Sequence, residues 1–514
     1  MNTQENGRSP ASILLWVPLL LGVVGLAVDV AIVHRFTVDD AYITLRYSRN
    51  VARGLGPVYN ATGARAEGYT SFTWMALLAV VHALRVDALV VAKTLGVLLT
   101  VATCALTFVW TWEDARGKQA RVVAAVAAVA GYAVLPRTAT HAVSGMETAL
   151  FTLLLTAALF AVSRLVQRGV RWALPFSALA LAAALTRPEA SLALAAASLA
   201  ALALWPGPAR ARTVVTLAAV FALPLVGYEL FRLRYYGLPL PLPFYVKVAS
   251  PGRLPGAEHV LEWLGSELRF GVPLLLLLSS PPRHLHPVLA AVGVLVVFFL
   301  LPQHLMGYAS RYLAPLDPAV CVLFGLGVGR LFEGSEGPLA GVREAWRTNA
   351  RASFLVAAVL VAFVLPAIMS LWEAPAEFRE RIEYADGLAA AHESLGRDLA
   401  ALHARSPRVA LSDAGAVPYL SDWWTLDLIG LNDARIAVTG SREPAWVLAS
   451  SPDVLVLASS DREVFTPFDW NTFERPIFDA ASAAGFKLVD RRRFASDYWL
   501  WVLVRPGFSL PRFA

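Results

Sequence analysis

Long apolar runs separated by short polar segments recur through the first three quarters of the chain. Most of them approach the length of about 20 residues that a helix needs to cross a bilayer. This pattern predicts an α-helical polytopic membrane protein with about 11 spans. The candidate spans lie near residues 12–34, 88–112, 121–135, 145–163, 172–186, 189–205, 213–231, 271–281, 287–301, 313–329 and 353–372.

The pattern changes at Glu373, where the long apolar runs end. The stretch Glu377–Arg405 is typical of an exposed helix, and short β-rich runs follow it, separated by turn-rich and helical pieces. We therefore predict two domains, a membrane domain at 1–372 and an α/β domain at 373–514. The predicted strands are Arg408–Leu411, Val454–Ala458, Phe486–Val489 and Tyr498–Val504.

Basic residues in the loops predict which side each loop faces. By the positive-inside rule, the arginine-rich loops belong to the cytoplasm. The count of spans then requires Phe72–Leu84 to be a re-entrant or interfacial helix, since about 13 residues are short for a span. The first external loop (35–87) and the C-terminal domain would face the periplasm or exterior of a bacterial inner (cytoplasmic) membrane. The loops assigned to the cytoplasm contain Arg116, Lys118, Arg121, Arg164, Arg168, Arg171, Arg210, Arg212, Arg283, Arg330, Arg343, Arg347 and Arg351.

Composition supports a membrane protein. Hydrophobic residues make up 57% of the chain and charged residues 16%, whereas soluble domains carry about a quarter charged residues. Cys104 and Cys321 both lie in apolar runs, so neither a disulfide framework nor a cysteine metal site is indicated. The net charge of +6 is spread over loops, and membrane-flanking arginines explain it better than a nucleic-acid partner does. The first run, Ile13–Val33, has no cleavage site after it, and we interpret it as an uncleaved anchor.

Two adjacent carboxylates, Asp39 and Asp40, directly follow this first run. One Asp suffices to cap a helix that begins near Ala41, and the second then bears like-charge repulsion. Such a pair at a membrane surface is suited to handling a hydroxyl group, so we predict a catalytic role for it. Capping alone is the alternative.

Arginines continue the helix that the carboxylates begin. Arg46, Arg49 and Arg53 share one helical stripe with Asp39, and the planar guanidinium suits a lipid phosphate. We predict that Arg46 and Arg49 bind a donor phosphate. The alternative is an interfacial helix with snorkelling arginines.

Further candidates stand at the outer ends of the runs. Arg311 opens a run without an obvious local carboxylate, and we assign it, with Lys247, to the same phosphate. Snorkelling at the membrane surface is the alternative for Arg311. Arg187 and Glu189 either contact substrate or satisfy each other. Glu67 either orients a sugar, holds a metal or caps the next helix, and Trp423 and Trp424 either stack on sugar rings or fill a core. The other predicted substrate contacts are Tyr42, Tyr69, Glu147, Tyr245, His304 and Asp413.

Taken together, these segments resemble the mycobacterial terminal β-arabinofuranosyltransferases and their wider bacterial relatives among the GT-C glycosyltransferases. The motifs that carry the resemblance are DDAYITLRYSRNVARGLGPVYN, EGYTSF, SGMET, TRPEA, PLPFYVK, SRYLAP and SDAGAVPYL with DLIGLND. The resemblance implies a GT-C membrane core, a periplasmic C-terminal domain and a polyprenyl-phosphate-linked sugar donor, with the Asp pair at the catalytic centre.

The expected reaction is transfer of the sugar from this donor to a cell-envelope glycan or lipid-linked acceptor by an arabinofuranosyltransferase-like enzyme. Asp39 is favoured as general base, and Asp40 either orients it or holds a divalent cation, Mg²⁺ or Mn²⁺. Two other functions compete with this one. A transporter or flippase of lipid-linked glycans predicts internal repeats and midplane charges, and neither is visible. A non-catalytic envelope assembly protein leaves the Asp pair unexplained.

Overall fold

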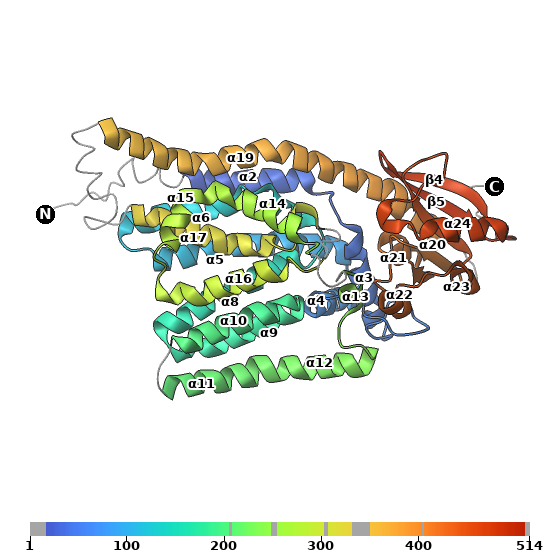
Figure 1. Cartoon of the computed structure of the whole chain (residues 1–514), viewed down its shortest axis with the longest axis horizontal. Helices are drawn as coiled ribbons and strands as arrows, with labels where there is room; N and C mark the ends of the chain where they lie inside the picture. Colours follow the sequence, from blue (N-terminus) through green and yellow to red (C-terminus); the bar gives the residue numbers. More distant parts are fainter. Residues whose placement is uncertain are drawn as a thin grey trace.

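The computed structural model describes residues 17–204, 208–247, 254–302, 307–331, 350–402 and 406–508. It has a bundle of helices with an α/β domain at one end (Figure 1). The helix α19 (Ala350–Leu388) runs along the bundle and continues to the α/β domain. The predicted domain boundary at residue 372 therefore lies inside one continuous helix.

Many of the bundle helices coincide with the predicted apolar runs. They are α2 (Val17–Val33), α5 (Ala88–Asp114), α6 (Lys118–Ala133), α8 (Thr148–Arg168), α9 (Ala173–Thr186), α10 (Glu189–Ala203), α11 (Pro208–Leu217), α12 (Leu223–Tyr236), α15 (Gly271–Leu278), α16 (His286–Phe298) and α17 (Asp317–Leu331). Helices outside these runs are α3 (Asp39–Ala52), α4 (Phe72–Ala83), α7 (Pro136–Val143), α13 (Leu242–Lys247) and α14 (Ala257–Glu267).

Four helical segments of the described chain are long and apolar enough to cross a membrane, and a bent pair of helices adds a fifth. The pair is formed by α6 and α7, which meet at an angle of 62°. Several other apolar helices are shorter than a bilayer requires; α9, for example, has 14 residues, or about 21 Å. The number of about 11 spans thus stays a prediction. The four segments are Ala88–Asp114, Thr148–Arg168, Ala209–Tyr236 and Tyr308–Leu331.

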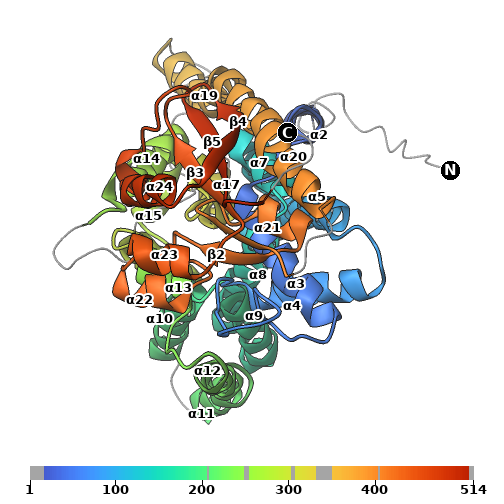
Figure 2. The ribbon, with the colours of Figure 1, turned by 90° about the vertical axis from the view of Figure 1, so that its right-hand side faces the viewer.

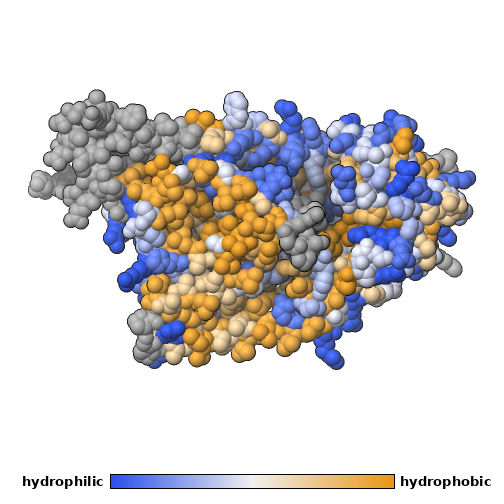
Figure 3. All heavy atoms as spheres, in the orientation of Figure 1, coloured by the Kyte–Doolittle hydropathy of each residue, from blue (hydrophilic) through white to orange (hydrophobic). Residues whose placement is uncertain are grey.

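The surface of the bundle agrees with a lipid environment. Apolar side chains cover much of the bundle face in Figure 3, whereas polar side chains dominate the C-terminal domain. Leu199, Leu223 and Leu275 are each more than 60% exposed. Monomeric proteins in water rarely expose so large a contiguous apolar surface, so we conclude that this part is embedded in a membrane.

At the C-terminal end of α5, four arginines from three segments of the chain line one large cavity together with Glu113 and Asp114. They are Arg116, Arg121, Arg283 and Arg330. The prediction that these loops share one side is confirmed. That this side is the cytoplasm stays a prediction.

A five-stranded sheet in the order β2-β1-β3-β5-β4 forms the C-terminal domain. The first three strands in this order are parallel, and β5 pairs antiparallel with β3 and β4. The central strand β3 is buried throughout and uniformly apolar apart from its last residue, as expected of a parallel strand covered on both faces. The bounds are β1 (Arg408–Leu411), β2 (Trp424–Asp427), β3 (Val454–Ser459), β4 (Lys487–Ala495) and β5 (Tyr498–Val504).

All four predicted strands are therefore confirmed, and β2 was missed. Its sequence, Trp-Thr-Leu-Asp, lacks the run of apolar residues that marks β1. Helices accompany the sheet: α20 (Ser394–Ala400), α21 (Ala416–Ser421), α22 (Ala434–Thr439), α23 (Pro444–Ala449) and α24 (Glu474–Ala483).

The carboxyl ends of the parallel strands face the bundle. The turn after β1 contacts Asp39 at the start of α3, and Leu431, in the loop after β2, lines a cavity together with Asp40. Figure 2 shows α3 and α4 beside α21 and β2 at this junction. Loops at the carboxyl ends of parallel strands are a common place for a binding site.

A candidate active site between the bundle and the C-terminal domain

The helix α3 begins at Asp39, yet neither carboxylate of the pair caps it. Its N-cap residue is Val38, and no side chain accepts a capping hydrogen bond there. Asp39 is buried, and its carboxylate accepts a hydrogen bond of 2.8 Å from the Ala416 backbone N–H. Burial raises the pKa of the Asp39 carboxyl to about 6, and nearby His392 opposes this shift. Asp39 is thus directed at the C-terminal domain.

Asp40 instead lines a cavity of about 50 Å³, which we call the polar cavity. The side chain of Asp40 is 18% exposed and lies 3.7 Å from the Arg311 guanidinium. Ser71, at the start of α4, is buried in the same wall, and its hydroxyl has no hydrogen-bond partner among the described residues. The other lining residues include Thr44, Tyr69, Thr70, Glu147, Lys247 and Leu431.

Arg311 is the central cation of this cavity. It is buried and lies between two carboxylates, 3.3 Å from Glu147 and 3.7 Å from Asp40. Its Nε and Nη1 atoms are buried and make no hydrogen bond to any residue that the structure describes. Buried donors without partners are rare, and they mark a place where a ligand can supply the acceptor.

A second cavity, of about 70 Å³, adjoins the first, and we call it the apolar groove. Glu147, Lys247 and Arg311 line both cavities. Arg187 lines the groove and pairs with Glu189 at 2.5 Å, and its buried Nη1 makes no hydrogen bond to the residues described. Lys247 donates a hydrogen bond of 2.9 Å to Tyr312. The apolar lining consists of Pro188, Pro243, Phe244, Phe298, Phe299 and Pro302.

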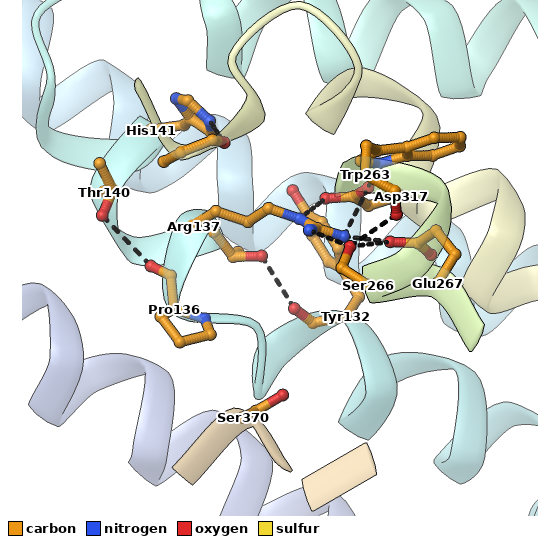
Figure 4. Close-up of polar contacts among 12 residues, drawn as sticks. Tyr132, Pro136, Arg137, Thr140, His141, Trp263, Ser266, Glu267, Asp317 and Ser370 are labelled. Atoms are coloured by element: carbon orange, nitrogen blue, oxygen red, sulfur yellow. Dashed lines mark hydrogen bonds and ion pairs between the residues drawn. The ribbon is translucent and has the colours of Figure 1, made fainter. Parts of the chain in front are cut away.

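A buried polar network supports the segment that carries Arg311. Arg137 of α7 binds Asp317 at 2.6 Å and also pairs with Glu267, and Trp263 donates to Asp317 (Figure 4). His141, one turn after Arg137, lies 2.9 Å from the Ala309 carbonyl oxygen. Ala309 and Ser310 have left-handed φ values of 48° and 51° directly before Arg311. Strain of this kind tends to collect at functional sites, where the surrounding structure holds it.

Two predicted phosphate ligands must be reassigned. Arg46 is 3% exposed, and its guanidinium donates to the carbonyls of Tyr59, Pro418 and Trp423 and to the Asn60 side chain. Arg49 donates to Tyr419 and pairs with Asp422 at 2.7 Å. Neither lines the polar cavity or the apolar groove. Both instead join α3 to the C-terminal domain, because the carbonyl oxygens of Pro418 and Tyr419 in α21 accept hydrogen bonds from them.

Among the other predicted substrate contacts of the membrane domain, some line a cavity and others are occupied by partners within the protein. Glu67 makes a buried bidentate pair with Arg232 of α12 at 2.6 and 2.7 Å, which leaves it no role as a sugar or metal ligand. Tyr42 donates to Glu393 at 2.6 Å and does not line the cavities, whereas Tyr69 does. Tyr245 lies in α13 and lines neither cavity, and His304 lies outside the described residues.

In the C-terminal domain, Trp423 is 2% exposed and belongs to a hydrophobic core, so its predicted stacking on a sugar is excluded. Trp424 is half-buried in β2, with Arg408 over its ring. Asp413 binds His392 at 2.8 Å and Tyr498 at 2.7 Å. The sequence pattern missed Ser71 and the groove phenylalanines, although Ser71 and Phe244 stand inside the motifs EGYTSF and PLPFYVK.

The donor set does not suit a divalent cation. The Arg311 guanidinium already lies between Asp40 and Glu147. Among the residues that the structure describes, no three His, Cys, Asp or Glu side chains gather as a metal site. We therefore derive no step through the Mg²⁺ or Mn²⁺ considered for Asp40.

Comparison with known proteins supports the resemblance seen in the sequence. The chain is 32% identical over 287 residues to the terminal β-(1→2)-arabinofuranosyltransferase of Mycobacterium tuberculosis, covering 50% of this chain and 43% of the relative. It is 34% identical over 263 residues to the Corynebacterium glutamicum protein of the same name, covering 46% and 37%. The chain thus matches less than half the length of these relatives.

The fold is similar to that of ArnT from Cupriavidus metallidurans bound to undecaprenyl phosphate. The TM-score is 0.60 at 14% identity, over 96% of this chain and 98% of ArnT. Residues 377–503 match a domain of unknown function, DUF8728. The expected resemblance to GT-C glycosyltransferases is thereby confirmed.

Proposed function

We propose that the protein transfers a sugar from a polyprenyl-phosphate donor to a hydroxyl group of a cell-envelope glycan or lipid-linked acceptor. The reaction would take place on the periplasmic or outer face of the cytoplasmic membrane. The names of the arabinofuranosyltransferase relatives and of the ArnT complex with undecaprenyl phosphate support the reaction class and the lipid. Both are carried over to this chain as part of the proposal.

One observation carries the proposal: where the polar cavity meets the apolar groove, buried guanidinium N–H groups make no hydrogen bond within the described part of the chain. Arg311 and Arg187 supply these groups, and Lys247 lies beside them. A phosphodiester held by the two arginines would have its sugar in the polar cavity and its polyprenyl chain along the phenylalanines of the groove. Planar guanidinium groups donate in parallel to phosphate oxygens, which favours this placement.

In the proposed reaction, Asp40 is the general base. It removes the proton of the acceptor hydroxyl, whose oxygen then attacks the anomeric carbon of the donor sugar. The bond between that carbon and the phosphate oxygen breaks, and its electron pair stays on the polyprenyl phosphate. Arg311 and Arg187 stabilise the charge that grows there in the transition state. We prefer Asp40 to Asp39 as the base because only Asp40 lines the polar cavity.

For the acceptor we propose an aromatic surface on the loop after β3. Phe468, Trp470 and Tyr498 have nearly parallel rings, with centroids 4.9 to 6.5 Å apart. Trp470 is 46% exposed, unlike Trp423. The loop follows the carboxyl end of β3, on the side of the sheet that faces the bundle. Flat aromatic faces suit the C–H faces of sugar rings, so Trp470 takes the role first assigned to Trp423 and Trp424.

The test uses the purified full-length protein in nanodiscs with a panel of labelled polyprenyl-phosphate sugars and an envelope glycan acceptor. We expect transfer of label to the acceptor and stoichiometric release of polyprenyl phosphate. Asp40→Asn should reduce transfer by at least about 10²-fold, which is typical of a lost general base. The exposed carboxylate of Asp386 provides the control, and Asp386→Asn should retain transfer.

Movement of the labelled lipid across vesicle membranes without transfer would contradict the proposal and favour a flippase. Unreduced transfer by Asp40→Asn would overturn the assignment of the base.

A further inference from the structure

Asp39 makes two hydrogen bonds to segments that follow the membrane domain in the sequence. Its carboxylate accepts from the Ala416 N–H, and its own backbone N–H donates to the Tyr384 hydroxyl of α19 at 3.2 Å. Asp39 and Ala416 are 377 positions apart in the chain. The first turn of α3 is thus held from outside its own domain.

Gly415 makes this contact possible. A Cβ atom at position 415 would overlap both the carbonyl oxygen and the carboxylate of Asp39. The φ of Gly415 is −100°, outside the left-handed region, so its backbone conformation alone does not require glycine. The close approach of the Gly415 turn to Asp39 is what requires glycine at this position.

We propose that the turn Asp413–Ala416 of the C-terminal domain is a positioning element of the reaction centre. By holding Asp39, it fixes the orientation of the neighbouring Asp40 against Arg311. Consecutive side chains of an α-helix point in directions about 100° apart. When Asp39 is held against Ala416, the side chain of Asp40 therefore points into the polar cavity. This inference rests on the proposed function and adds to it that the C-terminal domain completes the site.

A frame of hydrogen bonds holds the turn that contacts Asp39. His392, which follows α19 in the chain, binds Asp413 at 2.8 Å, and Tyr498 of β5 donates to the same carboxylate oxygen at 2.7 Å. His392 stabilises the ionised form of Asp39, whereas Asp413 and Asp40 oppose it. The turn therefore reaches Asp39 from a rigid, hydrogen-bonded frame. A positioning role requires such rigidity, because small displacements of a catalytic group lower the rate strongly.

The experiment compares two substitutions of Asp39 with Asp40→Asn in the full-length protein. Asn at position 39 keeps an oxygen that can accept from Ala416, whereas Ala removes it. We expect Asp39→Asn to retain at least about ten times the turnover of Asp40→Asn, and Asp39→Ala to lose turnover with little change in the donor KM. If Asp39→Asn is as inactive as Asp40→Asn, Asp39 acts by its charge and the inference is wrong.

Hydrogen exchange gives a readout that does not depend on activity. Peptides containing the Ala416 amide should exchange at least about tenfold faster in Asp39→Ala than in Asp39→Asn or wild type. Unchanged exchange in Asp39→Ala would overturn the inference even if transfer is lost. Absence of transfer by the wild-type protein would instead contradict the proposed function, which separates the two failures.

Gly415→Ala tests the close approach directly. We expect it to lower turnover at least about tenfold and to speed exchange at Ala416, because the added methyl displaces Asp39. Gly293→Ala is the matched control, since a Cβ there meets nothing within 4 Å. Equal activity of the two glycine variants would contradict the proposal.

Discussion

Arg311 is the residue whose surroundings distinguish a phosphate ligand from a structural arginine. Its two carboxylate neighbours lie at 3.3 and 3.7 Å, and its Nε and Nη1 atoms make no hydrogen bond to the described residues, although Nη1 is the atom 3.7 Å from Asp40. We expect Arg311→Ala to raise the donor KM and lower kcat while the acceptor KM changes little, because charge on the phosphate grows in the transition state. Steady-state kinetics with each substrate varied in turn measures this.

Arg311→Lys serves as the companion variant. It should recover only part of the activity, since an ammonium group keeps the charge but loses the planar arrangement of donors. Unaltered donor kinetics in both variants would return Arg311 to a structural role.

The single residue Glu474 should make the stability of the protein depend on pH. Burial raises the pKa of this carboxyl to about 8, while it accepts from the Ala458 N–H and from Asn471. The unfolded chain releases this proton near the ordinary value of 4.5, so the folded state binds more protons between these values. Stability should therefore fall as pH rises from about 4.5 to 8, by an amount on the order of a few kcal/mol.

Glu474→Gln should remove this pH dependence, because the amide stays neutral while its oxygen accepts the same hydrogen bonds. Thermal unfolding of the full-length protein at pH 6 and pH 9 measures it. Asp479→Asn, on the exposed side of the same helix, should leave the wild-type pH dependence intact. If Glu474→Gln lost as much stability between pH 6 and pH 9 as the wild type, Glu474 would not be the source of the pH dependence.

At the scale of elements, α3 is the helix of the bundle that contacts the C-terminal domain through its arginines. Arg46 donates to the end of α21 and to the loop of Tyr59 and Asn60, all from a buried position. Arg46→Ala leaves several buried carbonyls without a donor and should cost about 3 kcal/mol or more. The melting temperature should fall, while the donor KM of the remaining folded protein stays near the wild-type value.

A raised donor KM in a fully stable Arg46→Ala protein would restore the phosphate role that the sequence suggested. Arg53→Ala is the comparison on the same helix, because its pair with Asp422 is half exposed and should contribute at most about 1 kcal/mol.

At the scale of the whole molecule, the C-terminal domain brings the acceptor surface to the site. We expect Trp470→Ala to raise the KM for a long glycan acceptor more than for a minimal one, at nearly constant stability and donor KM, because Trp470 is exposed. Trp423→Ala should behave differently and lower stability by about 3–5 kcal/mol, as truncation of a buried aromatic residue does. Acceptor-length series and melting temperatures separate the two, and an unchanged length preference in Trp470→Ala would refute the acceptor role.

The sequence by itself determined the features that depend on local pattern. Apolar runs specified where the bundle helices lie, because a helix in lipid needs an apolar surface along its whole length. Alternation and buried apolar stretches predicted β1, β3, β4 and β5, and the two adjacent carboxylates, Asp39 and Asp40, marked the region of the site.

Only the tertiary structure decided which of the marked residues face a ligand. Asp39 and Asp40 are neighbours of one type, yet one contacts Ala416 and the other lines a cavity. Arg46 and Arg311 are both buried arginines, yet one is satisfied by backbone carbonyls and the other is not. The partners of each side chain come from segments up to 377 residues away, and no local pattern encodes which acceptor lies within hydrogen-bond distance.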